Sequence, residues 1–456
     1  MANGDTGWLP SSRRVKCDEQ RPVCGRCTSA GQQCRGYNVY TARPRDGPSI
    51  LDPLSRDYSD ALHYYHAVIQ PALAPDSQQL WNARIENAQS RREDFIFVVA
   101  YTQISMLWRY LGEAVRVDNL RRPPNQPLLV AAWQKCLLYL PKLLGIVIRG
   151  IADTDANPMG LGKTLDYVVD LFNYELLTQA WANCQAHAAG YVSLANYHGG
   201  VRAIFTWPIT PTTSFAYLLV QCIGANTTSS ISKQIWIFDS YSNEEIQTIL
   251  DENPVSAMPC RGYMLVAILR LTQLRVIAAR QQYIDSTFLV IGRSEMITGL
   301  MKNKKFTAGR ARVASAWPEV THRIFEVTID LYALLIVTKL ELEPGSRERE
   351  QQMNARGDSI AVFEATEQME YLYEQFTEME DCSHLRWPLI VMGAVAASFP
   401  QKYRDMVASR LRGIWDQPVP NWGAKWSLEK LEKFWASGKT AWDDCFVDDD
   451  FVPCLL

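Results

Sequence analysis

"KTLDYVVDLFNYELLTQAWANCQAHAAGYVSLANYHGGVRAIF", residues 163–205, repeats apolar side chains every three or four positions. That period is typical of one face of an α-helix, whereas strict alternation would indicate a strand. We expect two helices, separated near Ala188–Gly190 and ended by Gly199–Gly200. Glycine takes the left-handed conformation that closes a helix at little steric cost. This stretch therefore predicts a helical fold rather than a β-sheet.

The same period appears in stretches on both sides of this segment. "YSDALHYYHAVIQPAL" has Ser59 as a candidate N-cap and apolar side chains at Ala61, Tyr64, Tyr65 and Val68. Further stretches with helical spacing cover residues 92–115, 128–148, 320–343, 361–376, 386–399 and 427–438. Several are apolar nearly all round, which predicts buried central helices. We expect an all-α body of ten or more helices over residues 57–456.

Charge is distributed unevenly along the 456 residues. The net charge is −3, yet residues 1–48 hold eight Lys/Arg against four Asp/Glu. A basic N-terminal segment on a mildly acidic body indicates that only this segment meets a polyanion. The N-terminus lacks the charged and apolar regions of a signal peptide, and no apolar run is long enough to span a bilayer. We therefore expect a soluble, intracellular protein without a membrane partner.

Four of the eleven cysteines crowd into "SSRRVKCDEQRPVCGRCTSAGQQCRGY", residues 11–37. Their spacing is Cys17-x6-Cys24-x2-Cys27-x6-Cys34. A Cys-x2-Cys knuckle directs two thiolates at one ion, and flanking cysteines can complete tetrahedral sulfur coordination of zinc. So small a segment has almost no hydrophobic core, so metal binding would supply its folding energy. The scattered single cysteines show no even disulfide framework.

This segment resembles the second two-thirds of the binuclear zinc cluster of fungal transcription factors. In that family six cysteines hold two zinc ions, and Cys17, Cys24, Cys27 and Cys34 match the last four. The resemblance implies zinc as cofactor and double-stranded DNA as partner. The basic residues Arg13, Arg14 and Lys16 match the family's DNA-reading helix. Arginine suits bidentate contact with guanine O6 and N7, typically in a CGG triplet, and lysine suits phosphate.

The helical body resembles the regulatory region of the same family more loosely. The family's helix pair carries an E–L…H–x–G pattern, matched here by Glu175, His198 and Gly200. The resemblance implies three parts, which are a partial zinc-cluster domain (residues 1–38), a linker (39–56) and an all-α regulatory domain (57–456). It also implies a nuclear location and transcription machinery as partner. No heptads indicate a coiled coil, and a homodimer stays open.

The cysteine pattern is incomplete, because Gly7 and Pro10 stand where the first two family cysteines would fall. Neither zinc then keeps four ligands, so we expect at most one bound zinc, with Cys17 as its fourth ligand. Two explanations stay open. The messenger encodes a Cys-x2-Cys just upstream of this segment, or the protein is a co-regulator that has lost DNA binding and acts through its helical domain.

Other motifs favour structural interpretations. "NPMGLGKTLD" resembles a phosphate loop and suggests a helicase-like enzyme as a remote alternative, but its first glycine is Asn157 and no series of strands surrounds it. We expect a helix N-terminus with Lys163 in its first turn and no enzymatic activity. "AWDDCFVDDDFV" is either an acidic activation segment or a terminal helix that packs Trp442 and Phe446. We also expect an apolar internal pocket between the helices.

Overall fold

The computed structural model describes most of the helical body. It covers residues 53–72, scattered positions from 82 to 102, and 127–155, 160–177, 181–204, 212–237, 241–252, 260–280, 318–338, 365–417 and 422–446. The chain divides into two units, Met1–Pro53 and Leu54–Leu456. Apart from Pro53, every residue described here belongs to the second unit.

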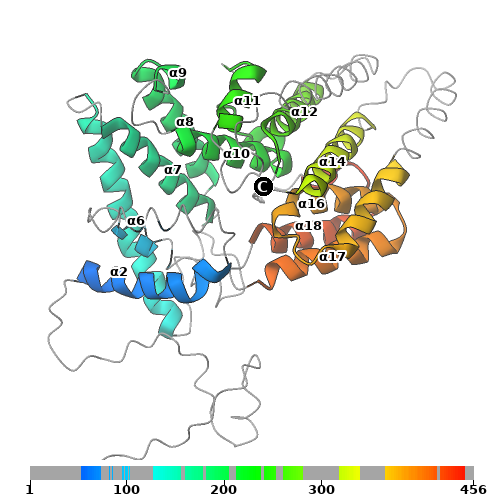
Figure 1. Cartoon of the computed structure of the whole chain (residues 1–456), viewed down its shortest axis with the longest axis horizontal. Coiled ribbons are helices and arrows are strands. Elements are labelled where there is room, and N and C mark those ends of the chain that lie inside the picture. The colour runs from blue at the N-terminus through cyan, green and yellow to red at the C-terminus, as the bar shows by residue number, and fades with distance from the viewer. Residues whose placement is uncertain are drawn as a thin grey trace, which may run out of the picture. The chain divides into compact units, whose positions relative to one another are not determined.

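The described residues form helices and turns and no strand, which confirms the all-α prediction (Figure 1). A further helical stretch without a label covers residues 365–378. The α-helices are α2 (Pro53–Tyr64), α6 (Pro127–Asp153), α7 (Leu161–Leu177), α8 (Trp181–Tyr197), α9 (Val201–Ile204), α10 (Thr212–Thr228), α11 (Asn243–Glu252), α12 (Gly262–Arg280), α14 (Glu319–Thr338), α16 (Arg386–Val395), α17 (Gln401–Trp415), α18 (Trp422–Ser437) and α19 (Trp442–Cys445). Short π- or 3₁₀-helical turns are η1 (Tyr65–Ile69), η2 (Gln70–Ala72), η4 (Ile231–Lys233), η5 (Ser383–Leu385) and η6 (Ala396–Ser398).

Helices that follow one another along the chain pack as neighbours. Helix α7 lies between α6 and α8 and also contacts α10, and α10 contacts α12. Helix α12 packs on α14, and α14 packs on α16. Helix α16 in turn contacts α17 and α18, which Figure 1 shows grouped with it in orange. A continuous core therefore runs through the described helices, from α6 to α18.

Two predicted helix boundaries are wrong. Helix α2 begins at Pro53, so Ser59 lies inside the helix and is not its N-cap. Proline suits a first helical position because its missing N–H has no helical acceptor there. The predicted break near Ala188–Gly190 also fails, because Gly190 lies within α8. Neighbouring helices outweigh the weak helix propensity of a single glycine.

Other boundaries follow local chemistry. Gly199 and Gly200 have φ angles of +98° and +88° and end α8, as predicted. Helix α11 begins with a capping box, in which the Ser242 amide donates to Glu245 and the Glu245 amide donates to the Ser242 hydroxyl. These bonds satisfy amides that a helix N-terminus leaves without helical partners. The predicted helical stretch 320–343 is observed as α14 as far as Thr338, and its remaining residues lie outside the described part of the chain.

None of the described helices combines the length and apolar character needed to cross a bilayer.

Candidate functional site

The predicted metal and DNA contacts lie outside the described residues. These are Cys17, Cys24, Cys27 and Cys34 for zinc and Arg13, Arg14 and Lys16 for DNA. The donor chemistry still permits a test. Four thiolates are the ligand set of a closed structural zinc site, whereas two zinc ions need the six cysteines of the full cluster. The residues present therefore fit one zinc ion and lack two ligands for a second.

Within the described part of the chain, no three His, Cys, Asp or Glu side chains gather closely enough to hold a metal ion. His63 and His66 lie on the exposed side of their helical segment, while Tyr64 and Tyr65 are buried, as expected for apolar positions of that helix. His66 Nδ1 lies 2.8 Å from Gln70 Oε1. Among the described residues, therefore, none forms a metal site.

The other described cysteines are free and buried. Burial raises the pKa of the Cys136 thiol to about 12, and the pKa of Cys445 also to about 12. The Cys382 pKa rises to about 11 for the same reason. A thiol with so high a pKa stays protonated near neutral pH and is a poor nucleophile and ligand. These cysteines are part of the buried core.

The phosphate-loop resemblance of residues 157–166 has no structural support. Lys163 lies in the first turn of α7, as predicted, and its Nζ stands 5.0 Å from the centre of the Tyr167 ring. The Thr164 hydroxyl donates to the carbonyl of Gly160 instead of facing a ligand. A phosphate loop needs a strand before it, and the described residues contain none. The nucleotide-binding interpretation therefore fails.

A buried polar group holds the C-terminal end of α10. The Arg275 side chain is 4% exposed, and its Nε donates to Asp443 Oδ1 over 2.6 Å. Its other nitrogens donate to the carbonyls of Thr227 and Ser229, each over 3.1 Å. The last carbonyls of a helix lack helical partners, and the helix dipole favours a cation there. We call Asn226, Thr227, Arg275 and Asp443 the α10 cap cluster.

Aromatic rings enclose this cluster. Trp442 Nε1 donates to the Thr227 carbonyl over 2.9 Å, and Trp387 Nε1 donates to the Thr227 hydroxyl over 3.2 Å. The Tyr332 ring packs edge-on against both tryptophans, with centroids 4.9 Å from Trp442 and 5.6 Å from Trp387. Burial raises the pKa of Tyr332, and the charge of Arg275 partly opposes that rise. Arg275 and the aromatic rings around it are buried, and Asp443 is partly exposed, so the cluster ties the end of α10 to the C-terminal segment.

The C-terminal acidic segment contributes directly to this core. Trp442 is 1% exposed and Phe446 is 3% exposed, and their rings lie 4.7 Å apart. Of the two interpretations that the sequence leaves open, packing of a terminal helix is confirmed for residues 441–446. Residues 447–456, which carry the remaining acidic side chains of this pattern, lie outside the described residues.

Sequence reasoning missed the cap cluster. Its one local signal is Arg275, a buried cation within the largely apolar α12. The loosely matched Glu175 is also buried, but the histidine near it is His187, whose Nε2 lies 4.0 Å from Glu175 Oε1. A buried ionic side chain needs a partner, yet nothing in the local sequence identifies which distant residue supplies it.

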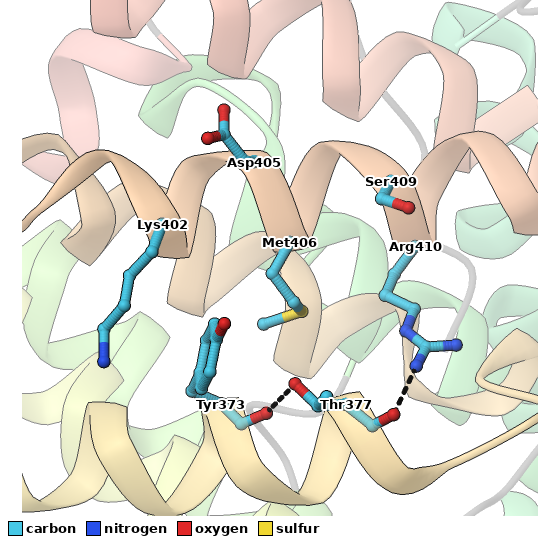
Figure 2. Close-up of a pocket in the computed structure, with 7 residues that line it drawn as sticks. All are labelled: Tyr373, Thr377, Lys402, Asp405, Met406, Ser409 and Arg410. Atoms are coloured by element: carbon cyan, nitrogen blue, oxygen red, sulfur yellow. Dashed lines mark hydrogen bonds between the residues drawn. The ribbon is translucent and has the colours of Figure 1, made fainter.

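A surface groove of about 380 Å³ lies between α17 and residues 365–378 (Figure 2). Its lining residues are Tyr373, Thr377, Lys402, Asp405, Met406, Ser409 and Arg410. Arg410 donates to the Thr377 carbonyl, and Lys402 pairs with Glu370 over 3.0 Å. Most of the lining side chains are polar and already engaged, so this groove differs from the apolar internal pocket expected from the sequence.

Comparisons with known proteins agree with the cysteine pattern. Residues 11–44 match the family described as "Fungal Zn(2)-Cys(6) binuclear cluster domain". The chain is 20% identical, over 96% of its own length and 87% of the other's, to a phomenoic acid biosynthesis cluster-specific transcriptional regulator of Leptosphaeria maculans. It is 54% identical over 37 residues to the aspercryptin biosynthesis cluster-specific transcription regulator atnN of Emericella nidulans, which is 8% of this chain and 6% of that protein.

No solved structure matches the chain. The family match covers the four cysteines and the basic run before them, and the similarity to the Leptosphaeria maculans regulator continues through the helical body. Residues 11–44 thus form a zinc-binding domain of the fungal Zn2Cys6 binuclear cluster type, and the chain that carries it is similar over most of its length to a transcriptional regulator.

Proposed function

We propose that this chain is a sequence-specific, zinc-dependent DNA-binding regulator of RNA polymerase II genes, and that those genes form a biosynthetic cluster for a secondary metabolite. The observation that carries the proposal is the match of residues 11–44, which hold the basic run and the cysteines together. Two similar proteins support the choice of target, since each is described as a biosynthesis cluster-specific regulator.

The proposal gives each of three consecutive segments its own role. Residues 1–38 read DNA, residues 39–56 link, and residues 57–456 form the regulatory domain that meets the transcription machinery. A regulator of this kind works in the nucleus.

Zinc, held by Cys17, Cys24, Cys27 and Cys34, would fix the short basic segment in one conformation. Arg13 and Arg14 then contact guanine edges in CGG triplets, and Lys16 contacts phosphate. Base contacts determine sequence preference, whereas phosphate contacts add affinity for any sequence. Binding therefore weakens steeply as salt concentration rises, because phosphate contacts release counterions.

The test measures binding of the full chain to CGG-containing and scrambled duplexes by fluorescence anisotropy. Arg13→Ala and Arg14→Ala should each lower the preference for CGG by about 1–3 kcal/mol, since each removes a bidentate contact. Lys16→Ala is the matched control and should weaken binding to both duplexes equally. Equal losses from all three variants on both duplexes would contradict the base-reading role.

A second candidate is a co-regulator without DNA binding, and Gly7 and Pro10 in place of two cysteines favour it. Zinc analysis of the purified full chain discriminates the two functions. We expect about one zinc per chain, and about two after Gly7→Cys and Pro10→Cys together. If the double variant prefers the CGG duplex and the parent chain does not, the result would support the co-regulator function for the parent chain. Strong preference in both would support the DNA-binding regulator.

A further inference from the structure

Two arginines converge on the turn that precedes α11. The guanidinium of Arg202, which belongs to α9, pairs with the carboxylate of Glu245. Arg270 of α12 donates from Nε to the side-chain oxygen of Asn243 over 2.5 Å. Asn243 and Glu245 follow Ser242 by one and three positions, so guanidinium groups from two other helices lie close to this serine.

Ser242 is accessible to an enzyme. It is exposed and lies in the turn between Tyr241 and the first residue of α11. Its hydroxyl accepts a hydrogen bond from the Glu245 amide over 3.2 Å, which is a contact within the first turn of the helix. Helix ends open more readily than the core does. The hydroxyl can therefore enter the active site of another protein while the core stays folded.

The residues after Ser242 have the charge pattern that acid-directed protein kinases select. Glu244 and Glu245 stand two and three positions after the serine. Kinases discriminate among their substrates through such charge patterns. The capping box of α11 accounts for Ser242 and Glu245, but it requires neither Glu244 nor the two arginines. The turn thus combines an acceptor hydroxyl, a recognition pattern and cations that suit the phosphorylated product.

The surroundings of Ser242 favour an added negative charge. A phosphoserine carries about −1.5 to −2 charges near neutral pH and three acceptor oxygens. The planar fork of an arginine suits bidentate contact with phosphate, and the dipole at the start of a helix favours an anion. Hydrogen bonds from the Ser242 amide and from Arg202 already lower the pKa of Glu245, so this turn stabilises the ionised carboxylate that it holds now.

We propose that Ser242 is a phosphorylation site for an acid-directed serine/threonine kinase, and that Arg202 and Arg270 hold the phosphate. In the reaction Ser242 Oγ bonds to the γ-phosphorus of ATP, the bond from that phosphorus to the leaving oxygen breaks, and ADP and the hydroxyl proton leave. Arg202 then exchanges the Glu245 carboxylate for the phosphate. The modification links α9 and α12 to the start of α11 through charge-assisted hydrogen bonds, and it does not depend on DNA binding.

Thr377 provides a matched position with opposite surroundings. It is exposed, and Glu378 and Glu380 follow it by one and three positions. It lies in the last turn of its helix, where the dipole disfavours an anion. Arg410 donates to the Thr377 carbonyl and opposes this effect in part. A phosphate at Thr377 should therefore be less stable as a dianion than a phosphate at Ser242.

Treatment of the purified full chain with an acid-directed kinase of the casein-kinase type and Mg-ATP tests the acceptor. Mass spectrometry of the digested chain should locate phosphate at Ser242, and Ser242→Ala should remove it from that peptide. Glu244→Gln leaves the capping box intact and should slow phosphorylation severalfold. Glu252→Gln, at the other end of α11, should leave the rate unchanged. Absence of phosphate from Ser242, or equal rates in the two glutamine variants, would overturn the proposal.

Phosphorus NMR of the full chain tests the two arginines. Phosphoserine replaces Ser242 in one chain and Thr377 in another, and each phosphate is titrated. The second pKa of the phosphate, ordinarily about 6, should be lower at 242 than at 377 by about 1. Arg202→Gln together with Arg270→Gln should raise the value at 242 and leave the value at 377 unchanged. Equal values at the two positions, or a low value at 242 that survives the double change, would refute the role of the arginines.

Discussion

Helices α6 and α16 are both built almost wholly of apolar residues, yet the fold uses them differently. Every residue of α16 is buried, including Arg386, whereas α6 leaves a stripe of leucine and isoleucine exposed. The neighbours differ as well. Helix α16 packs against α14, α17 and α18. Helix α6 packs on α7, and its Tyr139 hydroxyl donates a hydrogen bond to Asp57 of α2. An apolar helix can therefore be a central helix or a helix with a second, uncovered face.

Proline position already separates the two helices. Pro388 lies in the first turn of α16, where a missing N–H costs nothing. Pro141 lies inside α6, where it removes the bond to the carbonyl of Leu137. Pro141 and Leu137 are both on the exposed side, so water can bind that carbonyl. The internal proline of α6 thus lies on its exposed side.

The largest expected difference comes from removing a large side chain. Trp387→Ala in α16 should lower the free energy of unfolding by about 3–5 kcal/mol, because it opens a cavity and leaves Thr227 without its indole partner. Leu138→Ala in α6 should change it by about 0.5 kcal/mol or less, as exposed positions do. Urea unfolding midpoints measure both. Similar losses at the two sites would show that α6 is covered in the folded monomer.

Adding one methyl group should have opposite effects in the two helices. A Cβ on Gly393 of α16 would lie 2.6 Å from Leu431 Cδ1 and 3.2 Å from Val407 Cγ1. Gly393→Ala should therefore destabilise the fold by about 1–3 kcal/mol through overpacking. Gly145→Ala in α6 meets only the end of a flexible arginine and should stabilise the monomer by about 0.5–1 kcal/mol through helix propensity. Thermal unfolding of both variants checks the signs, and a destabilising Gly145→Ala would contradict the open surface.

The smallest expected difference concerns pH. Burial lowers the pKa of His384, just before α16, below its ordinary value of 6.5, and Asp381 opposes this shift. When a histidine is harder to protonate in the folded state, the folded protein becomes less stable as pH falls from about 6.5 through the folded-state pKa of that histidine. Helix α6 contains no histidine. We expect the denaturant midpoint to decrease as pH is lowered across this range. His384→Gln should make that decrease smaller. If His384→Gln leaves the change of midpoint with pH unaltered, other titratable groups cause that change.

Local patterns predicted much of the fold and of the candidate site. The helical period identified α6, α7, α8, α14, α16 and α18, and Gly199–Gly200 identified the end of α8, because both depend on neighbouring residues. It did not identify α10, α11, α12 or α17. The cysteine spacing identified the family for the same reason, since the ligands of a small metal site lie close together in sequence. The gap expected at Ala188–Gly190 failed because Gly190 sits on an exposed turn of α8 that its neighbours hold helical.

The contacts that the sequence did not predict join residues that are far apart in the chain. Arg275 and Asp443 are 168 positions apart, and Thr227 and Trp442 are 215 positions apart. Each residue taken alone resembles an ordinary member of a helix or an acidic tail. The uncovered face of α6 is equally invisible, because the periodicity of a helix shows which side chains are apolar and not which of them find a neighbour.

The α10 cap cluster also has a consequence for protein synthesis. Trp442 and Asp443 follow every other described helix, so they leave the ribosome after the chain that needs them. Until then the guanidinium of Arg275 lacks its carboxylate, and the space beside Tyr332 lacks its indole. Domains generally fold as units during translation, and exposed apolar surface attracts chaperones and promotes aggregation. A premature stop codon between Ser437 and Trp442 should therefore send the nascent regulator to degradation, even though nearly all of its helices would have been translated.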